Sequence, residues 1–341
     1  MTLPLHRPVR TGAMLALALA TAVTAACSSS STSVHVGSSA STAPYAITLY
    51  TSVTQNTVDA VVAGFKKEHP GANVSVYRAT TGDLNARIAA DQRTGGVRAD
   101  VIWGTDPLSM ETYAKDGLLK FDPITLPSGI PAQYSTAQLI PTRLLYLVLV
   151  VHKGFTPVPT SWADLTRPAY AGKVAIPDPA AAGSAFAALG YFDQAPGYGI
   201  AYYSKLKANG AVQVSTIPEV VTDVADGRYQ VGITLDSEVR GAIAEGSPVQ
   251  MVWPTPGAIA LYSPIAVTAD SKNSAADTAF LDYVLSEQGQ KEIAATGWQP
   301  VLTGVAGPPI PAGGQEVWPD WSSLFGWQQQ LLSQYQAIFG A

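Results

Sequence analysis

The chain has 341 residues, a net charge of −5 and only 13% charged residues. It contains no run of lysine or arginine, which argues against the basic surfaces that bind nucleic acid or an anionic membrane face. Close to three hundred residues follow the N-terminal segment. Since single hydrophobic cores stop growing at about 250–300 residues, we expect two lobes.

The N-terminal segment has the pattern of a secretory signal. Basic residues precede a short apolar run at 13–20, and small residues lead to Cys27, the only cysteine of the chain. The apolar run is shorter than the ~20 residues of a membrane-spanning helix. The position of Cys27 after two alanines resembles a bacterial lipobox, with Thr24 where Leu or Val is usual. We therefore expect residues 1–26 to be a signal peptide and Cys27 to be lipidated.

The serine-rich segment 27–44 is too polar to bury apolar surface. We expect it to be a flexible tether that spans about 20–25 Å between the lipid and the folded part of the chain. No later segment has the length of a membrane span without charges or prolines. The protein is therefore expected at the extracytoplasmic face of the bacterial cell membrane, held by its lipid anchor, or in the periplasm.

Strands and helices alternate in the first part of the mature chain. Short β-prone runs cover residues 46–50, 73–78 and 100–103. Each is followed by a segment with helical spacing of its apolar residues, at 57–68, 81–91 and 107–116. This order is typical of βαβ units with parallel strands, so the predicted fold class is α/β.

The longest apolar run after the signal lies at 144–152 and predicts a buried strand that crosses into a second lobe. The further predicted elements are strands at 173–177, 212–217, 229–235, 249–253 and 258–268, and helices at 184–192, 199–207, 219–225, 237–245 and 273–296. An apolar stripe at 327–339, with Trp327 in the core, is expected to pack across the first lobe. Residues 45–145 with 256–341 form the predicted first lobe, and residues 146–255 the second.

Catalytic signatures are missing from the sequence. It has no H-E-x-x-H, C-x-x-C, G-x-S-x-G, Walker loop or G-x-G-x-x-G. Beyond the tether only His69 and His152 remain, and a zinc site would lack its usual ligands. We therefore predict a protein that is not an enzyme and that needs no metal or cofactor.

Several ordered segments carry a family resemblance. They include PTSWADL at 159–165, GKVAIPDP at 172–179 and SEQGQ at 286–290. Their set resembles the type II periplasmic binding proteins, the class with ferric-ion binders and their phosphonate- and sugar-phosphate-binding relatives. The resemblance implies two α/β lobes, each a mainly parallel sheet flanked by helices, joined by two crossing strands and closing on a ligand. It also implies an ABC permease and ATPase as partners.

Ligands of open parallel sheets bind beyond the carboxyl ends of the strands. Hydroxyl groups are dense at these ends, and together with helix-start amides they suit an oxyanion. The same residues are also favoured helix caps, and the two roles coexist. The predicted ligand-binding residues are Thr51, Ser52, Thr54, Thr80, Thr81, Thr105, Asp106, Asp178, Gly183, Ser184 and Asp236.

The iron ligands implied by the resemblance do not carry over. The family's His, Glu and Tyr-Tyr pair align with Thr54, Gly82 and Ser237-Glu238, and a small gap brings in Asp83 or Asp236. The pair Tyr202-Tyr203 lies inside a predicted helix, where the family has packing residues, so we interpret it as core.

The predicted function is capture of a small oxyanion-bearing solute, such as an organophosphate or phosphonate, by a monomeric binding protein of an ABC importer. One alternative is ferric iron or a ferric chelate, bound through different residues. Another is a lipoprotein that senses a ligand without transporting it.

Overall fold

The structure is a computed structural model that describes residues 45–121, 126, 128–130 and 138–340. The predicted signal peptide, the lipidation site Cys27 and the tether lie outside the described residues. Within the described part of the chain, no helix has the length and apolar character needed to cross a membrane.

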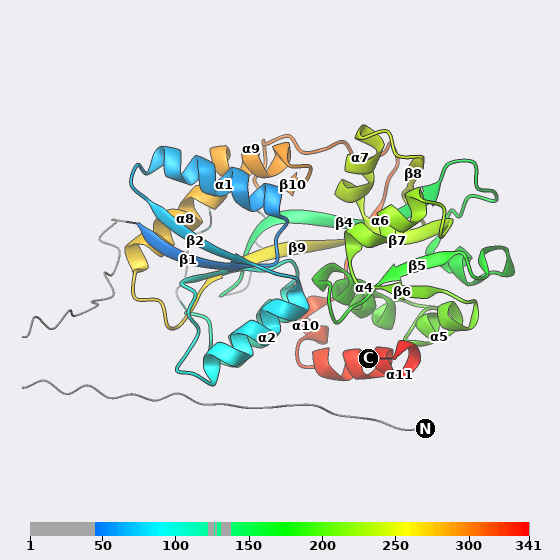
Figure 1. The fold of residues 1–341 in the computed structure, drawn as a ribbon, viewed down its shortest axis with the longest axis horizontal. Coiled ribbons are helices and arrows are strands. Elements are labelled where there is room, and N and C mark those ends of the chain that lie inside the picture. Colours follow the sequence, from blue (N-terminus) through cyan, green and yellow to red (C-terminus); the bar gives the residue numbers. More distant parts are fainter. Residues whose placement is uncertain (1–44, 122–125, 127, 131–137, 341) are drawn as a thin grey trace, which may run out of the picture. The chain divides into compact units, whose positions relative to one another are not determined.

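A mixed sheet in the strand order β2-β1-β3-β9-β4-β7-β5-β6 forms the centre of the fold (Figure 1). The first lobe is built on parallel strands, which are β1 (Ala46–Thr51), β2 (Asn73–Arg78) and β3 (Val101–Trp103). The second lobe is built on another parallel set, which is β5 (Val174–Pro177), β6 (Val212–Val214) and β7 (Val231–Leu235). The α/β class predicted from the alternation of elements is confirmed.

Two long strands connect the parallel sets. Strand β4 (Ile140–His152) runs antiparallel to β9 (Ala258–Val267) and, further along, antiparallel to β7. The side chains of β4 are buried almost throughout, which explains the long apolar run in the sequence. The predicted lobe boundary after residue 145 falls inside this shared strand, and the boundaries stay a prediction.

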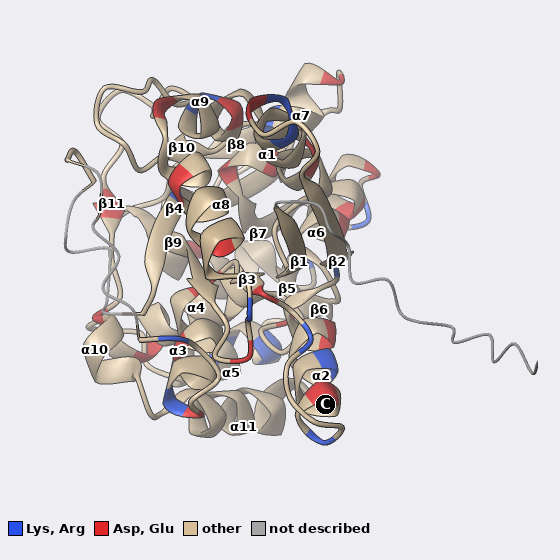
Figure 2. Cartoon of the chain, turned by 90° about the vertical axis from the view of Figure 1, so that its left-hand side faces the viewer, with Lys and Arg blue, Asp and Glu red and all other residues tan. Residues whose placement is uncertain are grey.

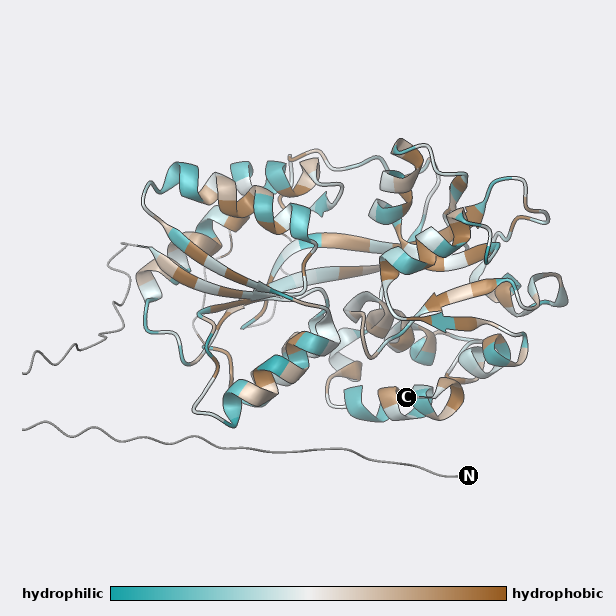
Figure 3. Ribbon diagram, viewed as in Figure 1, coloured by the Kyte–Doolittle hydropathy of each residue, from teal (hydrophilic) through white to brown (hydrophobic). Residues whose placement is uncertain are grey.

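Helices cover both faces of the first-lobe strands. On one face lie α1 (Gln55–Glu68), α8 (Ser274–Leu285) and α9 (Glu287–Ala295), and on the other α2 (Thr81–Gln92) and α3 (Pro107–Lys115). Phe65 of α1 packs edge-on against Phe280 of α8, with ring centroids 5.2 Å apart. Figure 3 shows hydrophobic residues along the strands and hydrophilic residues on the outer sides of these helices.

The second lobe has the same layered build. One face carries α4 (Gly183–Gln194) and α5 (Ala201–Ala208), and the other α6 (Ile217–Ala225) and α7 (Asp236–Ala244). The remaining elements are short 3-10 turns (Trp162–Thr166 and Pro168–Tyr170), β8 (Val249–Val252), β10 (Gln299–Pro300), β11 (Glu316–Val317), α10 (Trp321–Leu324) and α11 (Gln328–Phe339).

Two predicted elements end at a helix cap that the apolar pattern does not reveal. The segment expected as one helix at 273–296 is two, because Ser286 leaves the helical conformation and accepts a hydrogen bond from the Gly289 amide at 3.1 Å. The strand expected to reach Ile217 ends at Val214, since Thr216 caps α6 by accepting from the Glu219 amide at 3.3 Å.

The tail helix α11 corrects a third prediction. It packs mainly on α5 and α4 of the second lobe, and Gln328 at its start donates a hydrogen bond to the first lobe, to the Leu108 carbonyl of α3 at 3.5 Å. The Tyr335 ring meets that of Tyr203 edge-on at 5.2 Å, and the Tyr335 hydroxyl donates to Gln213 at 2.7 Å. Trp327, expected in the core, is 55% exposed because it lies one residue before the helix, outside this contact.

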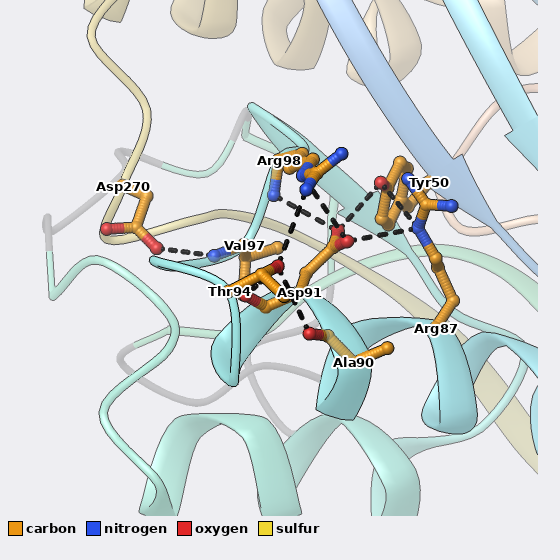
Figure 4. A network of polar contacts seen from close by, with 8 residues as sticks. All are labelled: Tyr50, Arg87, Ala90, Asp91, Thr94, Val97, Arg98 and Asp270. Atoms are coloured by element: carbon orange, nitrogen blue, oxygen red, sulfur yellow. Dashed lines mark hydrogen bonds and ion pairs between the residues drawn. The ribbon is translucent and has the colours of Figure 1, made fainter.

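A polar network closes the outer end of α2 (Figure 4). The Asp91 carboxylate is buried, accepts from the Tyr50 hydroxyl at 2.8 Å and forms ion pairs with Arg87 and Arg98 at 3.1 and 3.6 Å. It also accepts from the Arg98 amide at 3.3 Å. The network therefore ties the loop after α2 to strand β1.

Candidate functional site

A cavity of about 190 Å³ lies between the two lobes, beside β4. Its volume is below the ~300–1,000 Å³ of ordinary ligand pockets, so it suits a small solute. Seven of the predicted ligand-binding residues line it, namely Ser52, Thr54, Thr80, Thr81, Thr105, Gly183 and Ser184. Their contact with a ligand stays a prediction. The other lining residues are Arg78, Arg143, Leu145, Ala181, Ala182, Ser215, Thr216, Ile217, Pro218, Leu235, Glu238 and Trp298.

Five helices begin at this cavity, which are α1, α2, α4, α6 and α7. Thr80 caps α2 by accepting from the Asp83 amide at 3.2 Å, and Thr216 caps α6. The N-cap residues of α1 and α4 make no side-chain cap hydrogen bond, although the Gly183 amide at the start of α4 donates to Thr81 Oγ1 at 3.2 Å. The residue before α4 is Ala182, which has no side-chain acceptor. The other first-turn amides of α4 and the positive end of its dipole are therefore available to an anion.

The most unusual side chain of the site is Arg143. It is 1% exposed and follows an irregularity in the pairing of β4 with β9 at Pro141, a kind of feature that re-aims a side chain. Its guanidinium lies over the Trp298 ring, 4.2 Å from the centroid. Within the described part of the chain, its Nε and Nη1 atoms have no hydrogen-bond partner. Burial lowers the pKa of Arg143 to about 9, so the group stays charged at neutral pH.

Two more charged side chains line the cavity. Arg78 ends β2, and its Nε donates to the Val53 carbonyl at 3.1 Å. Glu238 stands in the first turn of α7. Burial raises the pKa of the Glu238 carboxyl, while the positive charges of Arg143 and Arg78 act in the opposite direction. The lining thus carries two guanidinium groups and one carboxyl group.

Sequence reasoning missed both arginines because it followed the hydroxyl groups at the strand ends. A signal was available for each. Arg143 is the one charged residue in the otherwise uncharged run 139–151, and Arg78 stands at the carboxyl end of a strand, where ligands bind. Glu238 aligns with a family tyrosine and is one of the carboxyl groups that could supply an anionic oxygen to iron, but it is not among the predicted ligand-binding residues.

Four predicted site residues do not line the cavity, because their side chains serve the fold. Thr51 donates to the Trp103 carbonyl at 2.8 Å, and Asp178 accepts from the Ala180 amide at 2.8 Å. Asp236 is buried and forms an ion pair with Arg240. Asp106 caps α3 by accepting from the Ser109 amide at 2.8 Å.

Asp106 nevertheless lies close to the cavity. Its carboxyl group is 1% exposed and sits against Gly183, where a side chain's first carbon would come within 2.1 Å of Asp106 Oδ2. That oxygen has no partner among the described residues. Burial is the main cause that raises the pKa of Asp106 to about 6.

The described residues do not form a cluster of side chains suited to bind a metal ion. They contain no group of three or more His, Cys, Asp or Glu side chains placed to hold an ion. The pair Tyr202-Tyr203 is buried in the core, as interpreted from the sequence, and the Tyr202 hydroxyl donates to the Trp162 carbonyl at 2.7 Å.

The two lobes touch directly at the rim of the cavity. The Gly82 amide of α2 donates to the Ala181 carbonyl at 3.3 Å, and the Gly183 amide donates to Thr81 Oγ1 at 3.2 Å. A methyl group on Gly82 would stand 2.7 Å from the Ala180 carbonyl oxygen. Close approach of the lobes therefore depends on the missing side chain of Gly82.

Two α/β lobes on either side of two crossing strands define the class of two-lobed periplasmic binding proteins. The family described as "Bacterial extracellular solute-binding protein" matches residues 47–299, and the chain belongs to this family.

Solved structures confirm the fold. The periplasmic binding protein AfuA from Actinobacillus pleuropneumoniae, with exogenous fructose-6-phosphate bound, aligns with a TM-score of 0.76 at 20% identity, covering 86% of this chain and 98% of that one. Iron-bound HitA from Pseudomonas aeruginosa aligns with a TM-score of 0.73 at 18% identity, covering 86% and 99%. The predicted type II binding-protein fold is therefore confirmed.

Curated relatives match at somewhat higher identity. The spermidine/putrescine-binding periplasmic protein of Escherichia coli (strain K12) is 29% identical over 144 residues, which are 40% of this chain and 41% of that protein. An uncharacterized protein of Haemophilus influenzae is 28% identical over 140 residues, 40% of either chain. The chain thus matches about two fifths of the length of these relatives. Spermidine/putrescine-binding periplasmic protein 1 of Haemophilus influenzae is 26% identical over 267 residues, 72% of either chain.

Proposed function

We propose that this protein captures a small oxyanion-bearing solute, an organophosphate or a phosphonate, in the cavity between its lobes. The observation that carries the proposal is the buried guanidinium of Arg143, which lines the cavity without a hydrogen-bond partner at Nε or Nη1 among the described residues. A buried charge is costly unless it is paired, and a phosphate-like group supplies paired acceptors for a guanidinium.

The rest of the cavity supports the same ligand. The start of α4, where only the Gly183 amide is bonded to a side chain, offers further amides and a positive dipole, and Ser184 and Thr105 add hydroxyl groups. Arg78 contributes a second positive charge. The AfuA structure with fructose-6-phosphate is a binding protein of the same fold with a phosphate ester, which is consistent with this class of solute.

Other ligand classes fit the lining less well. Polyamines, which the names of the curated relatives mention, would meet two guanidinium groups in the cavity lining. Ferric iron would meet a single carboxyl group among the lining residues. The test below therefore includes a polyamine and a ferric chelate beside the phosphate ligands.

In this proposal the protein delivers its solute to the permease and ATPase of an ABC importer. The lobe contacts at Gly82 and Gly183 form the closed state that docks on the permease. Lipidation at Cys27 holds the monomeric protein at the extracytoplasmic face of the membrane. A sensing lipoprotein would use the same cavity, and loss of solute uptake in a deletion strain separates import from sensing.

Calorimetric titration of the purified protein tests the proposal. Small phosphate esters and alkylphosphonates are expected to bind, and ferric citrate and spermidine at equal concentration are not. At about 100-fold over its dissociation constant the ligand should add about 2.7 kcal/mol to the free energy of unfolding. Binding of ferric citrate or spermidine without binding of any phosphate or phosphonate would overturn the proposal.

A further inference from the structure

A second hollow, of about 270 Å³, lies at the C-terminal end of α4. The end of α4, α10 and the first half of α11 form it, and it shares no lining residue with the cavity between the lobes (Figure 1). Because α4 rises about 1.5 Å per residue, its two ends are about 16 Å apart, so the two places are separate. The lining of this α11 hollow consists of Asp193, Gln194, Ser323, Leu324, Trp327, Gln330, Leu331 and Gln334.

Trp327 gives the α11 hollow a large aromatic ring that is 55% exposed. Its backbone is held on both sides, since its amide donates to the Leu324 carbonyl and its carbonyl accepts from the Leu331 amide, both at 3.0 Å. Its indole Nε1 donates no hydrogen bond within the described part of the chain. A single exposed apolar residue is ordinary on a protein surface. Trp327 differs because a hollow lined by polar side chains lies beside the ring.

The polar side chains of the α11 hollow form two groups. Gln194 serves the fold: its amide nitrogen donates to the Ser323 hydroxyl at 2.6 Å, and its amide oxygen accepts from the Asp320 amide at 2.9 Å. These bonds join the end of α4 to the start of α10 and fix one wall. The other group has no hydrogen-bond or ion-pair partner among the described residues and is exposed to water, and its members are Asp193, Gln330 and Gln334.

We propose that the α11 hollow is a second binding site and that it takes a neutral sugar unit. A pyranose ring has a face of C–H groups, which packs on an aromatic ring, and a rim of hydroxyl groups, which donate and accept hydrogen bonds. Trp327 supplies the aromatic ring and a free N–H donor. Gln330 and Gln334 supply amide donors and acceptors, and Asp193 supplies a carboxylate acceptor. The site is independent of the solute captured between the lobes.

The charges and the apolar area of the lining favour a neutral polar ligand over two others. None of the lining residues is lysine or arginine, so an anion would meet the Asp193 carboxylate without a compensating charge. A protein partner would require a broader apolar surface. Leu324 and Leu331 are 2% and 3% exposed, so Trp327 is the one large apolar side chain that this lining exposes.

The test is calorimetric titration of the purified protein with maltotriose, cellotriose and N,N′,N″-triacetylchitotriose. At least one of these trisaccharides is expected to bind, and Trp327→Ala should weaken that binding at least about tenfold. Trp327→Phe keeps an aromatic ring and should retain most of the affinity, while Gln330→Ala should lower it about threefold. Phe121→Ala removes an exposed aromatic ring outside the hollow and is the matched control, which should bind as the wild type does.

The outcomes also separate this site from the cavity between the lobes. A trisaccharide that still binds Trp327→Ala but not Arg143→Met would lie between the lobes, and the proposal would be wrong. No saturable binding of any of the three up to about 10 mM would overturn it as well and favour a protein contact at Trp327. Tighter binding of the trisaccharide than of its monosaccharide would assign the site to a polysaccharide, and equal affinities to a single sugar; both results support the proposal.

Discussion

Two buried charged groups in this molecule have opposite surroundings. Asp91 of α2 is surrounded by partners, with a tyrosine hydroxyl, a backbone amide and two arginines around one carboxylate (Figure 4). Arg143 of β4 has an aromatic face beneath it and a cavity beside it. The two side chains are 3% and 1% exposed, so burial alone does not distinguish them.

The two groups differ in the source of the partner for each charge, which is the protein for Asp91 and a ligand for Arg143. A charge paired by the protein holds the fold together, and its loss leaves groups such as the Tyr50 hydroxyl unsatisfied. A buried charge without a hydrogen-bonded partner in the protein costs stability, and a bound ligand can supply that partner. In the view of Figure 2, lysine and arginine are scattered among acidic residues.

The largest expected effect is on the Arg143 side of this comparison. Arg143→Met keeps the length of the side chain and removes its charge, so the affinity for a phosphate ester should fall about 100- to 1,000-fold. Titration calorimetry measures the loss. Lys205→Met, on an exposed face of α5, is the control and should bind as the wild type does. An affinity within about threefold of wild type would show that Arg143 does not bind the ligand.

On the Asp91 side the effect should fall on stability and not on binding. Asp91→Ala leaves the Tyr50 hydroxyl without its acceptor, so the free energy of unfolding should drop by about 2–3 kcal/mol. Urea denaturation measures it, with Asp59→Ala as an exposed comparison that should change little. A clear loss of ligand affinity at unchanged stability would reverse the roles assigned to the two groups.

Asp106 stands between the two cases, since one of its oxygens is bonded and the other is not. Its pKa is raised from 3.8 to about 6 by burial, so the folded state favours the protonated form. The stability of that form is present below pH 4 and is lost as the pH rises through about 6. Asp106→Asn should therefore be about 2–3 kcal/mol more stable than wild type at pH 8, and similar at pH 4. Parallel stability curves over this range would contradict the assignment.

The smallest expected effect concerns closure of the lobes. Gly82→Ala places a methyl group 2.7 Å from the Ala180 carbonyl oxygen, so the lobes should close less completely and bind a phosphate ester about tenfold more weakly. Gly241→Ala has open space around the added methyl and serves as the control. Small-angle scattering at saturating ligand should give a larger radius of gyration for the Gly82 variant alone. Equal radii would show that this contact does not limit closure.

Features that depend on local interactions can be predicted from the sequence, whereas features that depend on contacts between distant segments cannot. Alternating apolar patterns are local, so most strands and helices were predicted within a few residues. The break at Ser286 was missed because a cap inside a periodic run leaves the period unchanged. The place of α11 was missed because an apolar stripe does not say which of several helix layers will cover it.

The candidate site divides in the same way. Hydroxyl groups at strand ends were predictable, because parallel strands bring their carboxyl ends to one edge. The role of Arg143 depends on an irregular strand pairing and on Trp298, which lies more than a hundred residues away in the chain. Three-dimensional contacts of that kind leave no spacing pattern in the sequence.

The central claim is that the charge of Arg143 serves a ligand and not the fold. Its most direct measurement is urea unfolding of the wild type and Arg143→Met, each with and without a saturating phosphate ester. We predict that Arg143→Met without ligand is at least as stable as the wild type, and that the ester stabilises only the wild type. A variant that is several kcal/mol less stable without ligand, yet still stabilised by the ester, would contradict the account.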